Sequence, residues 1–384
     1  MKILLIGNLI EDRQESMHRF TRMLQTGLSA RGHTVSVIAP TLFLGRLAPH
    51  YRYNGIPKFL GYFDKFIVFP WKLRRRIWAD RPDVVHITDQ AGAVYRSAAC
   101  GVPVVTTCHD LLQIRAALGE VPQQRISSFG RRYQKWIAAS IARLENVVCV
   151  SSHTRSELVR LFNEPKGCSE VVWNSLNYPY QAIAPEIARA RLTALARKLG
   201  LAESLFAAPG PGYILQVGGL QWYKNRDGLI DIFTAVHRAT DPAPNLIMVG
   251  PPLESRHSEK LAAQKLSDTV IVLQSVSNEE LEALYNLAEC LLFPSLEEGF
   301  GWPIAEAQAC GCPVFASNRS PMTEVGGAFC VYFDPTEAEA AARSIVAAWP
   351  HRRHLRDPAL EYARKWQPTP MLESYEEVYQ AISL

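Results

Sequence analysis

Two glutamates bracket a glycine-rich turn in the segment FPSLEEGFGWPIAE, residues 293–306. A strand pattern ends at 293–295, the turn contains Gly299 and Gly301, and a helical pattern begins at Pro303. The first backbone N–H groups of a helix have no partner within the helix, and the helix dipole adds positive charge there. The turn therefore predicts a phosphate site, whose donors would be the amides of Phe300, Gly301 and Trp302.

Carboxylates beside a phosphate site suit hydroxyl groups rather than the phosphate itself. Glu298 stands before the turn and Glu306 follows it in the helix. A sugar on one side and a ribose on the other would supply the hydroxyls. An ordinary helix start with two exposed acids explains the same residues, and the sequence alone leaves both readings open.

A second candidate site follows another strand pattern, in QVGGLQWYKNR, residues 216–226. Gly218 and Gly219 end the strand, and Lys224 and Asn225 follow shortly after. A fixed cation at such a strand end can stabilise developing negative charge on a leaving group. The alternative is a lysine in a solvated loop.

Two further candidates lie in the first half of the chain. His109 ends a strand pattern, where it can either contact a ligand or be satisfied by neighbouring Asp110. In the loop after the first strand pattern, Ser16 is expected to cap a helix that runs to Arg31, with Glu15 beside it. The backbone amides of this loop could donate hydrogen bonds to a phosphate or to a second substrate that accepts the transferred group. Plain helix capping would account for Ser16 equally well.

Short Val- and Ile-rich runs alternate with helical patterns through all 384 residues, which is typical of parallel strands covered on both faces. We expect two doubly wound α/β domains, residues 1–190 and 191–365, followed by a C-terminal helix in 366–384. Breaker-rich stretches at 179–185 and 208–212 place the junction. The final helix either crosses back to the first domain or stays on the second. The predicted strands are Ile3–Ile6, Val35–Ala39, Val84–Thr88, Val104–Thr107, Val147–Ser151 and Val171–Trp173, then Tyr213–Val217, Leu246–Val249, Val270–Leu273, Leu291–Pro294, Val314–Ser317 and Val331–Phe333.

Composition excludes several classes of protein. The chain is 48% apolar and 20% charged with a net charge of +4, as expected for a globular protein. It has no apolar stretch long enough for a membrane span, no signal-peptide pattern, and no Cys or His spacing typical of zinc. We therefore expect a cytoplasmic protein with reduced cysteines and no metal or cofactor.

The charge is divided unevenly, with +12 in residues 1–191 and −8 in 192–384. The segment at 62–81 mixes six Lys and Arg residues with Phe and Trp, which is typical of a peripheral contact with a membrane surface. Arg131, Arg132 and Lys135 could extend this patch. The alternative is a helix that packs its aromatics inward and leaves a solvated basic face. No recognised motif supports binding to nucleic acid.

The spacing Glu298–seven residues–Glu306 is the EX7E signature of the retaining GT-B glycosyltransferases of family 4. The stretch from Val276 to Gly327 resembles the donor half of that family almost throughout. The resemblance implies the GT-B fold, with two Rossmann-like domains facing each other across a cleft, an acceptor domain first and a nucleotide-sugar domain second.

The resemblance also implies roles for the site residues. Glu306 would hold the ribose and Glu298 the donor hexose, while Lys224 would stabilise the leaving diphosphate. The family places a histidine like His109 close to the donor sugar. The remaining donor contacts would come from Gly218, Gly219, Asn225, Gly299, Phe300, Gly301 and Trp302, with Ser275 and Val276 near the base.

One family feature is missing, because the arginine that usually precedes this lysine by five residues is replaced by Gly219. Arg226 and Arg155 are the candidates to substitute for it. We expect a retaining, metal-independent hexosyltransferase that uses a nucleoside-diphosphate sugar and a hydroxyl acceptor, in bacterial polysaccharide or glycolipid assembly. A lipid-linked saccharide, used at the inner face of the membrane, fits as the acceptor. The alternatives are a phosphorylase, an epimerase, or a non-catalytic subunit that binds nucleotide sugars.

Overall fold

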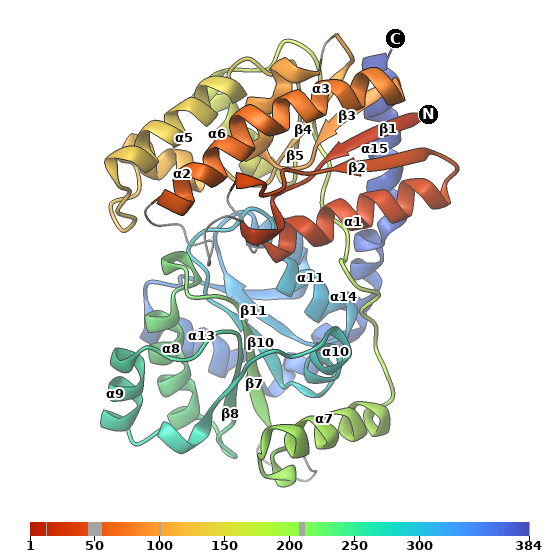
Figure 1. The fold of residues 1–384 in the computed structure, drawn as a ribbon. Helices are drawn as coiled ribbons and strands as arrows, with labels where there is room; N and C mark the ends of the chain where they lie inside the picture. The colour runs from red at the N-terminus through yellow and green to blue at the C-terminus, as the bar shows by residue number, and fades with distance from the viewer. Residues whose placement is uncertain (13, 45–55, 100, 207–211, 384) are drawn as a thin grey trace. The chain divides into compact units, whose positions relative to one another are not determined.

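The computed structural model describes residues 1–12, 14–44, 56–99, 101–206 and 212–383, and they form two units (Figure 1). The first unit comprises Met1–Asn177 with Pro368–Leu384, and the second comprises Tyr178–Gln367. Each contains a six-stranded parallel sheet covered by helices, so the predicted pair of doubly wound α/β domains is confirmed.

In the first unit the strand order is β2-β1-β3-β4-β5-β6. Its strands are β1 (Lys2–Ile6), β2 (Thr34–Ile38), β3 (Val84–Ile87), β4 (Val104–Cys108), β5 (Asn146–Cys149) and β6 (Ser169–Val171). Its α-helices are α1 (Glu15–Ala30), α2 (Ile56–Phe63), α3 (Phe69–Asp80), α4 (Leu112–Leu118), α5 (Ser128–Ile141), α6 (Ser152–Phe162) and α15 (Pro368–Ser383). A π-helical turn, η3 (Asp64–Val68), joins α2 to α3, and short 3-10 segments are η1 (Ile10–Asp12) and η4 (Gln90–Ala98).

In the second unit the strand order is β12-β11-β10-β7-β8-β9. Its strands are β7 (Tyr213–Val217), β8 (Asn245–Val249), β9 (Val270–Leu273), β10 (Cys290–Phe293), β11 (Val314–Ser317) and β12 (Cys330–Phe333). Its α-helices are α7 (Pro185–Leu199), α8 (Arg226–Ala239), α9 (Ser255–Ala263), α10 (Asn278–Leu287), α11 (Trp302–Ala309), α12 (Met322–Gly326), α13 (Ala338–Ala348) and α14 (Arg356–Ala363). Its short 3-10 segments are η5 (Glu203–Phe206), η6 (Trp222–Lys224), η7 (Ser267–Thr269), η8 (Gly327–Phe329), η9 (Trp349–Leu355) and η10 (Arg364–Trp366).

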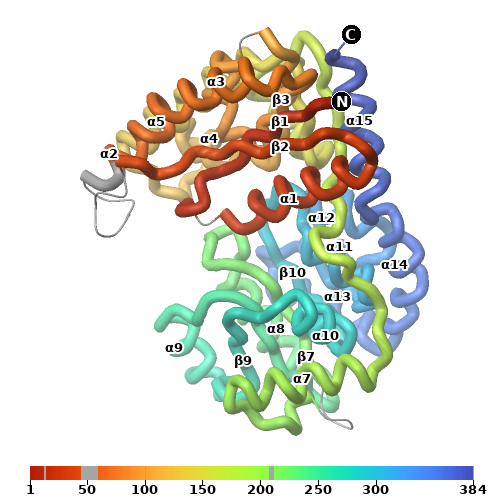
Figure 2. Tube along the Cα trace, turned by 45° about the vertical axis from the view of Figure 1, so that its right-hand side comes forward, coloured from red at the N-terminus to blue at the C-terminus, as the bar shows by residue number. Residues whose placement is uncertain are grey.

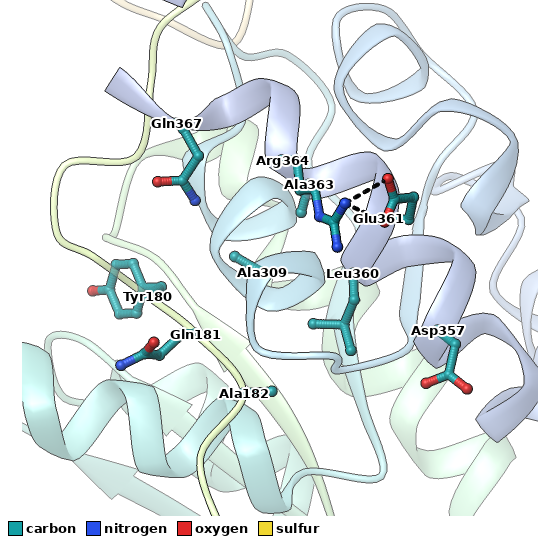
Figure 3. Close-up of a pocket in the computed structure, with 10 residues that line it drawn as sticks. All are labelled: Tyr180, Gln181, Ala182, Ala309, Asp357, Leu360, Glu361, Ala363, Arg364 and Gln367. Carbon is teal, nitrogen blue, oxygen red and sulfur yellow. Dashed lines mark hydrogen bonds and ion pairs between the residues drawn. The ribbon is translucent and has the colours of Figure 1, made fainter. Parts of the chain in front are cut away.

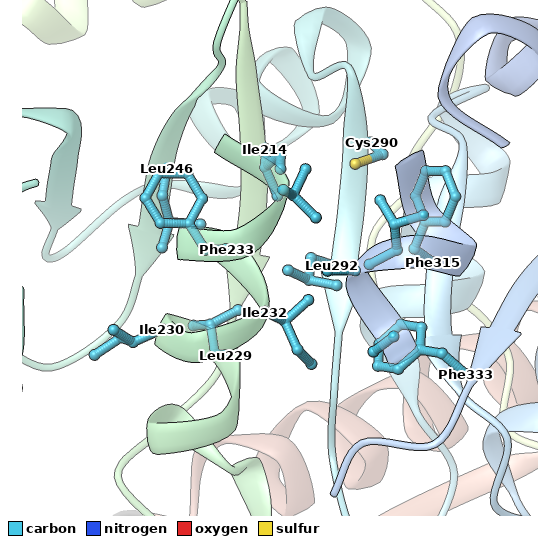
Figure 4. Packing of buried hydrophobic residues seen from close by; sticks show 14 of the residues in the cluster. Ile214, Leu229, Ile230, Ile232, Phe233, Leu246, Cys290, Leu292, Phe315 and Phe333 are labelled. Carbon is cyan, nitrogen blue, oxygen red and sulfur yellow. The ribbon is translucent and has the colours of Figure 1, made fainter. Parts of the chain in front are cut away.

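One core of the second unit lies between its sheet and helices α8 and α13 (Figure 4). Ile214, Leu246 and Leu292 come from three strands and meet Phe233 of α8, all fully or almost fully buried. Burial of this kind is the main stabilising contribution to such a sheet, and it fixes the strand ends from which the loops of the site extend.

The boundary between the units differs from the predicted one at residue 190. Residues 178–184 belong to the second unit because their backbone is bound to α10. Gln181 N donates to Glu282 Oε1 at 3.1 Å, and Ile183 N donates to Asn286 Oδ1 at 2.9 Å. A proline-rich stretch that resembles a free linker in the sequence is thus attached to a helix of the second unit.

Helix α15 packs against the first unit, beside α1 (Figure 2). Its Tyr375 and Tyr379 hydroxyls lie 2.8 Å from Thr107 Oγ1 and 2.7 Å from His86 Nδ1, both buried in the sheet. Gly27 of α1 allows the close approach, since a Cβ there would lie 2.5 Å from Leu372 Cδ1. The chain therefore returns to its first unit after completing the second.

Candidate active site

The loops that follow β7 and β10 bring Lys224 and Glu298 together. The two strands are parallel neighbours, with Leu215 opposite Leu291, so their carboxyl ends lie at one edge of the sheet. Lys224 Nζ donates to Glu298 Oε1 at 2.6 Å, and the two side chains are 15% and 11% exposed. Nζ also lies 5.5 Å from the centre of the Phe293 ring. The structure thus places one cation and one carboxylate, both mostly shielded from water, where ligands bind in doubly wound folds.

Asn225 fixes the position of the neighbouring lysine. Its backbone is left-handed, with φ of 52°, and its side-chain oxygen accepts from Gly228 N to cap α8. Its side-chain nitrogen donates to the carbonyls of Pro294 and Pro335, which follow β10 and β12. The Asn225 amide therefore links three loops. The sequence predicted a contact with the nucleotide-sugar donor for Asn225 and did not indicate this structural role.

Glu306 lies on α11 and is only 5% exposed. The hydroxyl of buried Tyr285 on α10 donates to its Oε2 at 2.9 Å. Burial, followed by the nearby Glu306 charge, raises the pKa of Tyr285 well above its ordinary value, so the phenol stays a donor. Sequence analysis missed Tyr285, although a tyrosine on the apolar face of a predicted helix was a signal that a buried partner existed.

The turn between the two glutamates has the predicted geometry. Gly301 precedes α11 with φ of 104°, a conformation that favours glycine, and Pro303 lies in the first turn. Phe300 is buried and packs edge-on against Trp302 and Trp366, with ring centres 6.0 and 5.3 Å apart. These contacts hold the backbone of the turn rigidly at the helix N-terminus.

The other predicted donor residues lie at the same edge of the sheet. Gly218 leaves room for the Gln216 side chain, whose Nε2 would lie 2.9 Å from a Cβ at that position. Ser275 follows β9 with φ of 56°, and Val276 comes next. Gln216 on β7 is 2% exposed, and its side-chain oxygen has no hydrogen-bond partner within the described ranges. A glutamine inside an apolar strand run was the signal for this residue.

Both arginines proposed to compensate for Gly219 already have hydrogen-bond partners. Arg226 is buried and donates to the carbonyls of Pro251 and Pro252, and burial lowers its pKa. In the first unit, Arg155 donates to Glu164 Oε1 at 2.6 Å and to the carbonyl of Ser169. Backbone carbonyls and a neighbouring acid thus engage both guanidinium groups, and a substitute at either position stays a prediction.

His109 is buried at the carboxyl end of β4 in the first unit. Its Nε2 donates to the carbonyl of Thr88 at 2.9 Å, and the ring lies 4.7 Å edge-on from Phe20. Burial is the main reason that its pKa is lowered, so the ring is neutral. Asp110 instead accepts from Leu112 N, so the alternative in which Asp110 satisfies His109 is wrong.

Glu15 and Ser16 are exposed in the first turn of α1. The helix begins at Glu15 and Gln14 precedes it, with no side-chain cap, so the expectation that Ser16 caps the helix is wrong. The reason is local: Asn8 Nδ2 donates to Gln14, and also to Asp89 after β3 at 2.6 Å. This pairing holds the loop, and the N-cap position falls on Gln14, two residues before Ser16.

A cavity of about 370 Å³ in the second unit lies between residues 180–182 and α14 (Figure 3). Ala309 and Leu360 provide apolar wall, and the ion pair of Arg364 with Glu361 lies at its side. None of the predicted site residues lines it.

Across the residues that the structure describes, no helix is long and apolar enough to cross a membrane. Within the same ranges no three His, Cys, Asp or Glu side chains gather as metal ligands.

Comparison with known proteins agrees with this architecture. Residues 201–366 match the family model described as glycosyl transferases group 1, and residues 17–178 match glycosyltransferase family 4. The chain is similar to O-antigen chain mannosyltransferase B of Escherichia coli, with 28% identity covering 71% of this chain and 68% of that protein. It is also similar to a GDP-mannose-dependent alpha-(1-6)-phosphatidylinositol dimannoside mannosyltransferase of Mycobacterium tuberculosis, with 24% identity over 90% of this chain and 88% of the relative. The match to D-inositol 3-phosphate glycosyltransferase of Salinispora tropica spans only 59% of that protein.

Solved structures share the fold over almost the whole chain. Sucrose-phosphate synthase from Thermosynechococcus elongatus superposes with a TM-score of 0.71, at 19% identity over 99% of this chain and 98% of the other. HepE of Anabaena, solved with UDP and glucose, gives 0.68 at 17% identity over 99% of each chain. The two sheets, with a lysine and two glutamates at the carboxyl edge of the second, therefore define a GT-B protein. Within that class the chain belongs to the glycosyltransferases of the family 4 type.

Proposed function

We propose that this protein transfers a hexose from a nucleoside-diphosphate sugar to a hydroxyl acceptor, with retention of configuration and without a metal ion. The observation that carries the proposal is the shielded Lys224–Glu298 pair, with buried Glu306 on the adjoining helix. A cation for a diphosphate and two carboxylates for hydroxyls match the groups of such a donor.

In this proposal Lys224 and the N-terminus of α11 receive the charge of the departing diphosphate. A cation in a mostly water-excluded loop stabilises developing charge more strongly than the same cation in water. Helix N-termini favour phosphate for the same electrostatic reason. The chain's own positive groups would therefore do what a metal ion does in other transferases.

Glu298 would accept hydrogen bonds from hexose hydroxyls, and Glu306 would do so from the ribose. The hydrogen bond from Tyr285 fixes the Glu306 carboxylate in one orientation, as a selective pocket requires. His109, whose Nε2 proton is committed to Thr88, would offer Nδ1 as an acceptor to a hexose hydroxyl.

The proposed reaction proceeds on one face of the sugar. The bond from the anomeric carbon to the diphosphate oxygen breaks, and a bond to the acceptor oxygen forms on the same side. The acceptor proton passes to the departing phosphate oxygen. No protein nucleophile is needed, so Glu298 acts through its charge and hydrogen bonds.

The donor sugar is proposed to be of the mannose or glucose type. An O-antigen chain mannosyltransferase and a phosphatidylinositol dimannoside mannosyltransferase are among the relatives, and HepE has been solved with UDP-glucose. Those names also favour a saccharide or glycolipid acceptor, including a lipid-linked one.

The test is a thermal-shift panel with GDP-mannose, UDP-glucose, UDP-N-acetylglucosamine and the free nucleotides. A ligand at about 100 times its Kd stabilises the protein by about 2.7 kcal/mol. We expect one base class to raise the Tm of the wild type and of Glu339→Ala, whose side chain is 90% exposed on α13. The same ligand should not shift Glu306→Ala. A shift retained by Glu306→Ala, or no shift with any nucleotide sugar, would contradict the proposed donor site.

Gly219 supports a second candidate function, a subunit that binds the donor without turning it over. The loop after β7 lacks the family arginine, and both Arg226 and Arg155 are engaged by other partners. Product analysis with donor and a panel of acceptors separates the candidates. A transferase yields glycosylated product, a phosphorylase requires free phosphate, an epimerase needs no acceptor, and the non-catalytic subunit yields nothing.

A further inference from the structure

A line of apolar side chains faces solvent along α2, η3 and α3 of the first unit. The exposed fractions of these side chains range from 46% to 79%. We call this line the outer ridge, and it consists of Phe59, Phe63, Ile67, Trp71 and Trp78. The opposite face of the same helices buries Phe69, Leu73 and Ile77 in the core. The aromatics of the segment are therefore divided between two faces, and the expectation that they all pack inward is wrong.

The π-helical turn aligns the outer ridge. In an α-helix each residue turns by about 100°, so Trp78 would be rotated by about 100° from Phe59. The wider turn at Asp64–Val68 contains about one residue more than an α-helical turn. This extra residue cancels the offset of about 100° between Phe59 and Trp78. Residues spaced four apart before the turn thus share a face with Ile67 in the turn and with Trp71 and Trp78 after it.

The same turn points two charged residues inward as anchors. The Asp64 carboxylate accepts from Phe43 N at 2.8 Å and from Leu44 N at 3.2 Å, in the loop after β2. Lys65 is paired with Asp12 in the loop after β1. Both loops follow carboxyl ends of strands, so the ridge is attached to the edge of the sheet where ligands bind in this fold.

Positive charge flanks the outer ridge. Neither 66–79 nor 128–141 contains an acidic residue. Helix α5 lies beside the ridge helices (Figure 1), where Phe129 contacts Phe59 and Trp136 contacts Phe66, at ring distances of 6.0 and 4.8 Å. The exposed cations of the two helices are Lys72, Arg74, Arg75, Arg76, Arg131, Arg132 and Lys135, of which Arg76 is paired with Asp80.

A groove of about 560 Å³ lies at the far end of α3. Trp71 and Trp78 form apolar walls, and Arg74, Arg75 and Arg81 line it with guanidinium groups. Indoles can contact an apolar chain while neighbouring cations bind a phosphate ester. A phospholipid at a bilayer surface presents both groups together.

We propose that the outer ridge and its flanking cations bind an anionic phospholipid bilayer, with the apolar side chains in the interface and the cations on lipid phosphates. A second copy of this chain fits poorly, because a two-fold contact would bring the two sets of cations together. The surface belongs to the first unit, whereas the proposed donor residues belong to the second, so the proposal does not depend on the proposed function. It does place the acceptor-side loops next to lipid.

The test is co-sedimentation with vesicles of phosphatidylcholine alone or mixed equally with phosphatidylglycerol. We expect binding to the anionic vesicles, weaker binding in high salt, and little binding to phosphatidylcholine. Arg74→Gln/Arg75→Gln should lower partitioning by about fivefold per charge removed. Trp71→Ser/Trp78→Ser should lower it by about tenfold or more. All four side chains are exposed, so the Tm should stay unchanged.

Matched controls come from elsewhere on the molecule. Trp173→Ser removes an indole that is 45% exposed, and Arg343→Gln/Arg364→Gln removes two exposed guanidinium groups. These variants should bind vesicles as the wild type does. Nucleotide-induced Tm shifts should be the same in all variants, so failure of lipid binding and failure of the donor site are distinguishable.

Three results would overturn the proposal. The first is no binding of the wild type to anionic vesicles at about 0.1 M salt, where charges are screened beyond about 10 Å. The second is binding that the ridge variants leave intact. The third is a different occupant of the surface: a dimer in sedimentation velocity that Trp71→Ser/Trp78→Ser dissociates, or tighter binding to a single-stranded oligonucleotide than to vesicles.

Discussion

Removing the Lys224 ammonium should harm catalysis far more than folding. Lys224→Met keeps the apolar stem and leaves the Glu298 carboxylate, 11% exposed, without its cation. A hydrogen bond to a charged group contributes about 1.5–3 kcal/mol, and the remaining exposure favours the lower end. We expect a loss of about 1.5 kcal/mol in the free energy of unfolding.

The catalytic loss should be larger. A group that stabilises charge in the transition state is worth about 2.7–4 kcal/mol, or about 10²–10³ in kcat. Adding Glu298→Gln to Lys224→Met removes the stranded carboxylate, so stability should largely return while turnover stays low. The pair of variants thus separates the structural contribution of the ion pair from the action of the lysine on the leaving group.

The assays are urea unfolding and initial rates of nucleoside diphosphate release. Lys260→Met is the matched control, because Lys260 pairs with Asp231 at 2.7 Å away from the site. It should lose little stability and no turnover. A kcat for Lys224→Met within about threefold of wild type, or turnover restored by Glu298→Gln, would refute the role of the lysine, since the expected loss is about 10²–10³.

Three further predictions concern buried contacts. Tyr285→Phe removes the hydrogen bond to Glu306 and should weaken nucleotide binding about tenfold by calorimetry; unchanged affinity would mean that Tyr285 does not orient the carboxylate. Gly27→Ala should cost about 1–3 kcal/mol by overpacking Leu372, and Leu372→Ala in the same chain should relieve the clash; a neutral or stabilising Gly27→Ala would contradict the close approach of α15. Burial lowers the pKa of His86 to about 3, against about 6.5 when unfolded. As the pH is lowered, the unfolded chain takes up a proton at His86 before the folded chain does. The contribution of neutral His86 to the free energy of unfolding is therefore complete above about pH 6.5 and decreases towards pH 3, by about 5 kcal/mol in total. His86→Gln should show a flatter pH profile of the urea midpoint, and an equally steep profile would exclude His86 as the cause.

Most of the strands could be predicted from sequence because they are short runs rich in Val, Ile and Leu that become buried. The two edge strands of the first sheet are only partly buried, and β6 (Ser169–Val171) begins and ends two residues before the predicted strand Val171–Trp173. Tyr213–Val217, Val270–Leu273 and Val314–Ser317 agree with the structure at both ends. The sequence Ser-Asn-Glu-Glu at 277–280 is typical of a capping box, and Ser277 and Glu280 form one at the start of α10. These features depend on local chemistry, which neighbouring residues report directly.

Features that depend on contacts between distant segments were not predictable. The expected cap at Ser16 is displaced by the pairing of Asn8 with Gln14, and His109 uses a carbonyl on the neighbouring strand. The outer face of 62–81 depends on a π-helical turn that no residue pattern announces, since Asp64 and Lys65 look like ordinary surface charges. In the site, sequence located Lys224 and the two glutamates but not the hydrogen bonds of Tyr285 or Asn225.

The return of α15 to the first unit sets an order of synthesis. Residues 178–367 are contiguous, so the second unit is complete as soon as that stretch has left the ribosome. The first unit, although translated first, lacks the partners of His86 and Thr107 until Tyr375 and Tyr379 emerge. The face of its sheet that α1 and α15 share stays partly uncovered while the later unit is synthesised, so we expect aggregation and chaperone binding to be favoured at this nascent stage.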